Sequence, residues 1–424
     1  MGETSKLAMA VELPKMYRVK QLLSCEYLSE AQIVFRIREE MDRPEIKGRI
    51  KPGMKIAVTC GSRGVANIPL IIKTIVAELK GYGADPFVVP AMGSHGGATA
   101  EGQKKILEGY GVTEEYVGCA IRSSMEVTRI GTVKGSPVYI DRNAAQADGI
   151  VVAGRIKPHT GFRGKYESGL MKMMVIGLGK QKGAQVCHED GFGVMAENIE
   201  ARGREILKKA PILCGIGIVE NAKDQTMLIA GMTPSEILEK EPEYLETARK
   251  QLPSLPVEAA DVLVVEQIGK DISGDGMDPN ITGTYCSKYA GDGGLHAERV
   301  VILDLTEESK GCAIGMGMAD FTTESFYKKI NLEESYPNAI TSKMIVQAKI
   351  PMILKNDREA IQIALRTCLG IEKRRPRIIR IKDTLHIEEF WVSEALVEEL
   401  KDNSRIRILE GPVDLEFDQA GRLK

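Results

Sequence analysis

Aromatic side chains, net charge and long apolar runs are all scarce in this sequence of 424 residues. Aromatic residues make up 5% of the chain, with one tryptophan, so a base-stacking surface for nucleic acid is not expected. The net charge of -2 gives no electrostatic reason to bind nucleic acid or an acidic membrane surface. No apolar run approaches the roughly 18 residues that span a bilayer. These scarcities leave a small molecule as the expected partner, with no nucleic acid and no membrane.

Cysteine pairs are also missing, because the eight cysteines are scattered and form no CxxC pattern. This spacing argues against a disulfide framework and against a cysteine-rich zinc site. The first residues lack the apolar core of a signal peptide, and Lys6 does not fit the myristoylation pattern that begins with Met-Gly. The sequence therefore favours a protein of the reducing cytoplasm.

A repeated order of strand, glycine loop and helix predicts an α/β fold. Apolar runs indicate strands and 3.6-residue periodicity indicates helices, in the order strand 55–59, helix 68–80, strand 85–89, helix 99–110. This order is typical of βαβ units with a largely parallel sheet. Ligands of such sheets lie at the carboxyl ends of the strands, where the glycine loops with Arg63 and His95 follow. A later strand, 148–152, leads at the same edge to His159.

The length of the chain predicts two α/β domains, because one ordinary core rarely serves so many residues. We expect an N-terminal domain over 1–252 and a second domain over 257–391, while the tail 392–424 could return to the first domain. Other expected elements are strands at 118–122, 127–140, 212–219, 261–265, 300–305, 350–354 and 378–381, helices at 191–208 and 233–251, and a strand or a helix at 31–40. The glycine-rich loop 273–295 is long enough to be functional or mobile.

The stretch 154–189 carries the densest chemistry. It holds His159 and His188, two of five histidines, and Lys172 within an apolar run. A lone lysine in such a run must extend to water, pair with an acid or take part in chemistry. Each histidine, His95 included, also has an ordinary explanation, because a histidine on a glycine loop or helix start often only bonds its own turn.

Charged residues on the loops suit an anionic ligand, although a surface charge on a turn is the simpler alternative. Arg63 and Lys270 each follow a strand and could hold a carboxylate. A basic cluster mixed with glycines looks suited to phosphate: Arg155, Lys157, Arg163, Lys165, Lys180 and Lys182. No GxxxxGK[ST] or helix-opening GxGxxG occurs, so a nucleoside triphosphate or NAD site is not indicated.

Taken in order, these motifs resemble the nickel-pincer lactate racemase family of 2-hydroxyacid racemases and epimerases. The resemblance covers most of the chain, from about 55 to 270 and more loosely beyond. It rests on the order and spacing of Arg63, His95, Pro158-His159, Gly169 to Lys172, His188, and Gln267 to Asp271. The resemblance implies two α/β domains, an N-terminal cofactor-binding catalytic domain and a C-terminal substrate-closing domain, with the active site in the cleft between them.

The resemblance also implies a role for each matching residue. Lys172 would hold, covalently, a nickel-pincer pyridinium-3,5-bisthiocarboxylic acid mononucleotide, which other enzymes build, and His188 would be the protein ligand of the nickel. His95 and His159 would be the paired general acid/bases. Arg63, Gln267 and Lys270 would bind the substrate carboxylate. Two positions of the hydroxyl make two bases useful, and imidazole suits neutral pH.

Two departures separate the chain from the family pattern. The stretch 59–62 lacks the acidic residue that usually precedes the arginine, and the stretch after His159 carries a short insertion. Lactate itself is therefore not assumed as the substrate. Two alternatives remain open: a non-catalytic carboxylate-binding protein on the same scaffold, and a metal-dependent hydrolase or lyase in which His95, His159 and His188 converge on one ion.

Overall fold

The computed structural model describes residues 2–62, 64–291 and 293–424, which form two compact units. We call residues 24–252 the central unit, and residues 1–23 with 253–424 the terminal unit. This division differs from the expected one at both ends of the chain. Residues 1–23 do not join the first domain, and neither does the tail, because β1 (Met16–Gln21) pairs with β15 (Ile406–Val413) in the sheet of the terminal unit.

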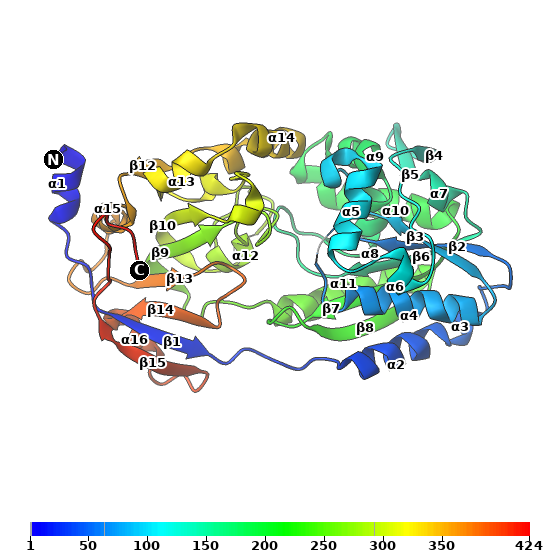
Figure 1. Ribbon diagram of the computed structural model, residues 1–424, viewed down its shortest axis with the longest axis horizontal. Helices are drawn as coiled ribbons and strands as arrows, with labels where there is room; N and C mark the ends of the chain where they lie inside the picture. Colours follow the sequence, from blue (N-terminus) through cyan, green and yellow to red (C-terminus); the bar gives the residue numbers. More distant parts are fainter. Residues whose placement is uncertain (1, 63, 292) are drawn as a thin grey trace. The chain divides into compact units, whose positions relative to one another are not determined.

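The central unit is built on a five-stranded sheet in the order β3-β2-β6-β7-β8. Its first four strands are mutually parallel and β8 is antiparallel. This arrangement confirms the α/β class and the largely parallel sheet (Figure 1). The strands are β2 (Lys55–Cys60), β3 (Asp85–Pro90), β6 (Gly149–Arg155), β7 (Ile212–Glu220) and β8 (Thr226–Met232), with a separate hairpin of β4 (Val127–Val133) and β5 (Ser136–Asp141).

Both faces of this sheet are covered, as the continuous apolar strands require. Ile56 and Val58 of β2 face one core, while Ala57 between them faces the other. The first core is covered by α2 (Glu30–Met41), α3 (Pro44–Lys47), α4 (Ile68–Gly81), α5 (Ala100–Gly109) and α6 (Glu114–Val117). The second core is covered by α7 (Arg142–Ala145), α8 (Leu170–Lys172), α9 (Lys180–His188), α10 (Met195–Lys209) and α11 (Pro234–Gln251).

Two segments of the central unit were uncertain or wrong in the prediction from sequence. Residues 31–40 lie in helix α2, which begins with a capping box between Ser29 and Gln32 and buries Ile33, Ile37 and Met41 at four-residue intervals. The expected strand 118–122 is wrong, because Ile121 makes only an isolated bridge to Val88.

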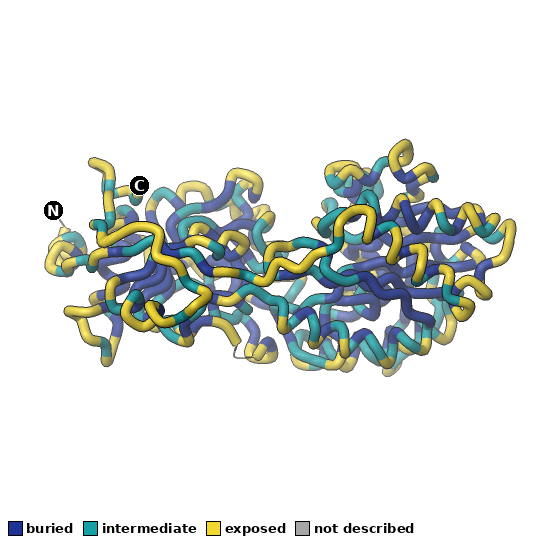
Figure 2. The backbone as a smooth tube through the Cα atoms, turned by 90° about the horizontal axis from the view of Figure 1, so that it is seen from below, coloured by how far each residue is buried: buried dark blue, intermediate teal, exposed yellow. Residues whose placement is uncertain are grey.

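The terminal unit holds an eight-stranded mixed sheet in the order β12-β11-β10-β9-β13-β14-β1-β15. The first five strands are parallel and the last three are antiparallel. Its strands, besides β1 and β15, are β9 (Ala259–Ile268), β10 (His296–Leu305), β11 (Phe321–Thr323), β12 (Met352–Leu354), β13 (Ile378–Ile381) and β14 (Glu389–Ser393). Its helices are α1 (Glu3–Met9), α12 (Pro279–Thr282), α13 (Glu324–Lys329), α14 (Leu332–Ser342), α15 (Asp357–Thr367) and α16 (Glu394–Leu400). Figure 2 shows buried segments in the interior of each unit and exposed segments at its surface.

Candidate active site

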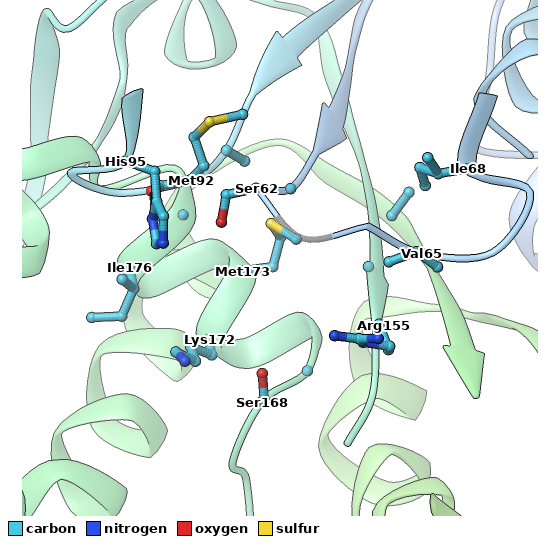
Figure 3. Close-up of a pocket in the computed structure, with 16 residues that line it drawn as sticks. Ser62, Val65, Ile68, Met92, His95, Arg155, Ser168, Lys172, Met173 and Ile176 are labelled. Carbon is cyan, nitrogen blue, oxygen red and sulfur yellow. Dashed lines mark hydrogen bonds between the residues drawn. The ribbon is translucent and has the colours of Figure 1, made fainter. Parts of the chain in front are cut away.

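A pocket of about 160 Å³ opens at the carboxyl ends of three neighbouring parallel strands of the central unit. Gly61 and Ser62 follow β2, Met92 follows β3, and Gly154 is the last residue but one of β6. His95 and Lys172 line the same pocket (Figure 3). The pocket thus lies at the sheet edge where α/β proteins bind ligands. The remaining walls are largely apolar: Val65, Ile68, Met173 and Ile176.

His95 stands on the loop between β3 and α5. Its Nδ1 lies 2.7 Å from the carbonyl oxygen of Met92, so Nδ1 carries the proton and donates it. In the neutral ring the lone pair is then on Nε2. Neutral His95 is therefore suited to accept a proton at Nε2.

Lys172 ends the short helix α8 and is followed directly by a π-helical turn, η2 (Met173–Gly177). Single π turns inside helices are rare and are found disproportionately at functional sites. The start of α8 is held by the buried carboxyl group of Glu241 on α11, which accepts a hydrogen bond from the backbone N–H of Met171 at 3.0 Å. Burial raises the pKa of the Glu241 carboxyl to about 8.

Gly169, just before α8, is required by this anchor. A Cβ at that position would lie 2.1 Å from Oε1 of Glu241. The Gly-x-x-Lys spacing noted in the sequence therefore has a steric reason: the glycine admits the carboxylate that holds the backbone one residue before Lys172.

His188 is the last residue of helix α9. Its Nδ1 donates to the carbonyl oxygen of Ala184 at 2.7 Å, which leaves the Nε2 lone pair available to a metal. Burial lowers the pKa of His188, and the positive charge of Lys172 lowers it further. His188 is thus kept neutral, as a metal-ligating imidazole must be, and it lies within electrostatic reach of Lys172.

His159 lies on the loop after β6, and its ring nitrogens have the opposite donor and acceptor roles from those of His95. Its Nδ1 accepts the backbone N–H of Gly161 at 2.9 Å, so in the neutral ring the proton is on Nε2. Its backbone N–H donates at 2.8 Å to Glu167, a buried carboxylate whose pKa is raised by burial. Glu167 also accepts from Arg249 and from the N–H of Gly164. The inserted loop after His159 is thus tied to one acidic side chain.

The ring of Phe192 joins two of the predicted histidines. Its centroid lies 6.1 Å from that of His159 and 5.8 Å from that of His188. His159 also packs on Phe162, with 4.4 Å between the centroids. His159 and His188 therefore share one aromatic neighbour. His95 and Lys172 line the same pocket, and the charge of Lys172 lowers the pKa of His188.

The predicted carboxylate-binding residues are placed separately. Arg63 lies outside the described residues. Gln267, near the end of β9, and Lys270, just after it, belong to the terminal unit, where the side chain of Lys270 donates to Asn338. The following Asp271 accepts hydrogen bonds from Thr306 at 2.6 Å and Ser309 at 3.0 Å. The Gln267–Asp271 motif is therefore a well-bonded turn.

The residues of the basic cluster expected to bind phosphate have different partners in the structure. Lys180 is fully buried and pairs with Asp141 at 3.2 Å, so this member of the expected cluster is wrong. Arg155 lines the pocket but is paired with Glu220 at 2.5 Å. Arg163 donates to the carbonyl oxygen of His159. Sequence reasoning could not find these pairs, because each partner lies dozens of residues away or on the main chain.

The arrangement of metal-ligating side chains and the character of the helices bear on the alternatives. Among residues 2–62, 64–291 and 293–424, no group of three or more His, Cys, Asp or Glu side chains is arranged to hold a metal ion. The alternative in which three histidines converge on one ion therefore lacks its site. In the described chain, no helix combines the length and the apolar character needed to cross a membrane.

The central unit thus combines a three-layer α/β arrangement with a strand-end pocket that His95 and Lys172 line. Residues 5–200 match the family model of the lactate racemase N-terminal domain. Residues 5–200 are therefore similar to the N-terminal domain of lactate racemases.

Two solved structures are similar to this chain at the level of the fold. The lactate racemase apoprotein from Thermoanaerobacterium thermosaccharolyticum is similar over 85% of this chain and 93% of that one, with 16% identity and a TM-score of 0.50. A protein from Thermotoga maritima, solved by a structural genomics consortium, is similar over 86% of this chain and 99% of that one, with 12% identity and a TM-score of 0.51. No curated protein matches the sequence.

Proposed function

We propose that the protein is a racemase or epimerase that inverts the C2 carbon of a 2-hydroxyacid by reversible hydride transfer. The observation that carries the proposal is the strand-end pocket that both His95 and Lys172 line. The positive charge of Lys172 also lowers the pKa of His188, which supports the proposal. The resemblance of the sequence motifs implies cofactor attachment for Lys172, nickel ligation for His188 and acid/base catalysis for His95.

The donor set fits the cofactor that the family implies. Lys172 would hold the pyridinium mononucleotide through its amine, and neutral His188 would offer Nε2 to nickel beside the sulfur ligands of the cofactor. When bound, the nickel-pincer group supplies a reversible acceptor for the hydride of C2. Loading of this group requires cofactor-building enzymes as partners, since the chain offers only the attachment residues.

The chain's own residues then handle the proton and the charge. Nε2 of His95 accepts the hydroxyl proton as C2 loses its hydride, and the substrate becomes a planar 2-oxo acid. Return of the hydride to the opposite face places the oxygen on the other side, where Nε2 of His159 donates a proton. The neutral rings fit these two tasks, because His95 offers a lone pair at Nε2 and His159 a proton. Arg63, Gln267 and Lys270 are the proposed ligands of the substrate carboxylate.

The test is a racemisation assay in D₂O on protein co-expressed with cofactor-building enzymes, screened across chiral 2-hydroxyacids by chiral chromatography. Hydride transfer predicts inversion with the original hydrogen retained at C2. Deuterium at C2 would contradict the mechanism, and tight binding without inversion would favour a carboxylate-binding protein. Lys172→Ala and His188→Ala should abolish turnover, whereas Lys208→Ala, at an exposed lysine near the end of α10, should not.

A further inference from the structure

The central unit contains a buried ammonium group that the proposed mechanism does not use. Lys180, the first residue of α9, is 0% exposed, as are its partners Asp141 and Gln103. Its amine lies 3.2 Å from Oδ2 of Asp141, donates to Oε1 of Gln103 at 3.0 Å, and also donates to the carbonyl oxygen of Pro90. The ammonium therefore donates two hydrogen bonds and forms an ion pair with the carboxylate of Asp141.

The acceptors come from separate elements. Pro90 ends β3, Asp141 ends β5, and Gln103 lies on α5. Asp141 in turn accepts the backbone N–H of Ala144 at 3.0 Å. One ammonium thus joins a strand of the main sheet, the hairpin and two helices, in surroundings where an unpaired polar group is costly.

Gln103 extends this connection to the acid/base loop. Its Nε2 donates to the carbonyl oxygens of Gly93 at 2.9 Å and His95 at 3.3 Å. The amide therefore has a fixed orientation, with its oxygen toward Lys180 and its nitrogen toward the backbone of the loop that carries His95. The backbones are also in close contact, since a Cβ on Gly102 would lie 1.9 Å from the carbonyl oxygen of Gly96.

We infer that Asp141, Lys180 and Gln103 form a positioning network that sets the His95 loop and ties it to α9, the helix that ends in His188. Gln103 acts on His95 through the loop carbonyls, and Lys180 fixes Gln103 while it begins the helix of the proposed nickel ligand. The acid/base residue His95 and the proposed metal ligand His188 are thereby both positioned by one buried network. The inference rests on the proposed function for the roles of His95 and His188.

The Gln103→Glu variant tests this inference because it keeps the shape of the side chain. A carboxylate still accepts from Lys180, but its second oxygen faces the two carbonyls that the amide nitrogen held. The first readout is the set of histidine ring signals in the apoprotein, labelled with ¹⁵N-histidine. The chain has five histidines, and His296 and His386, both in the terminal unit, serve as internal references.

We expect Gln103→Glu to shift the ring signals of His95 and to leave those of His296 and His386 unchanged. In the loaded enzyme we expect kcat to fall by about 10- to 100-fold with KM within about twofold, because a misplacement on the order of 1 Å costs rate about 100-fold. Gln181→Glu, on the exposed side of α9, is the matched control and should leave both readouts unchanged.

Ring signals of His95 that stay at their wild-type positions would overturn the inference, whatever happens to activity. If Gln103→Glu does not fold, Gln103→Asn provides the same reading, since the shorter side chain withdraws the amide by one methylene without adding charge. The proposed function fails separately: wild-type protein that is loaded but does not racemise any 2-hydroxyacid refutes the function, while shifted His95 signals still support the network.

Discussion

The buried carboxyl of Glu241 predicts a pH-dependent weakness in the helix that carries Lys172. Its pKa is raised by burial from an ordinary 4.5 to about 8, so the folded protein binds an extra proton between these values. A group whose pKa is raised on folding contributes stability below the unfolded pKa and loses it as pH rises toward the folded pKa. Stability of the central unit should therefore fall between pH 4.5 and 8.

The size of the effect follows from the two pKa values. One pKa unit corresponds to about 1.4 kcal/mol, so full ionisation costs on the order of 4 kcal/mol across this window. For a unit of this length, 1 kcal/mol moves Tm by roughly 2–4 °C. Glu241→Gln, which cannot ionise, should gain about 10 °C in Tm relative to wild type between pH 5 and pH 8.

The assay is thermal unfolding of wild type and Glu241→Gln from pH 5 to pH 9. Glu243→Gln, an exposed glutamate two residues away on the same helix, is the matched control and should show a constant difference from wild type. A constant difference for Glu241→Gln as well would refute the reasoning, because it would mean that this carboxyl does not take up a proton on folding.

Two further substitutions have defined outcomes. Lys180→Met leaves the Asp141 carboxylate buried without its cation, and should lower the free energy of unfolding by roughly 3–5 kcal/mol in a chemical unfolding experiment. Adding Asp141→Asn should recover part of that loss. A double variant no more stable than Lys180→Met alone would contradict the pairing. Tyr166→Phe should lower the free energy of unfolding by about 1–2 kcal/mol, because the Tyr166 hydroxyl donates at 2.7 Å to the carbonyl oxygen of Leu238. Within α11 that carbonyl has no N–H partner on the next turn, since residue 242 is a proline. An unchanged unfolding midpoint would show that water replaces this hydroxyl.

The regular elements of the central unit could be predicted because their patterns are local. β2 and α4 carry unbroken apolar runs or clear 3.6-residue periodicity, and both appear within a residue or two of their expected bounds. The edge at which His95 lies also followed from the βαβ order. The segment α8-η2-α9 could not be predicted, since an apolar run interrupted by glycines fits neither helical nor strand periodicity and a π turn has no sequence signature.

Long-range partners account for what else the sequence did not reveal. The pairing of β1 with β15 joins residues about 390 positions apart, and no local pattern announces it. Lys180 was expected in a phosphate-binding cluster because glycines and other basic residues surround it in sequence. Its burial depends on Asp141 and Gln103, which only the folded chain brings to it.

The central claim is tested most directly by intact mass and nickel content of the protein, purified after co-expression with cofactor-building enzymes that load a known lactate racemase in parallel. The account predicts a mass adduct that maps to Lys172 and near-stoichiometric nickel that is lost in His188→Ala. Unmodified protein without nickel, while the parallel racemase is loaded, would contradict the account and shift the assignment to a carboxylate-binding protein on the same fold.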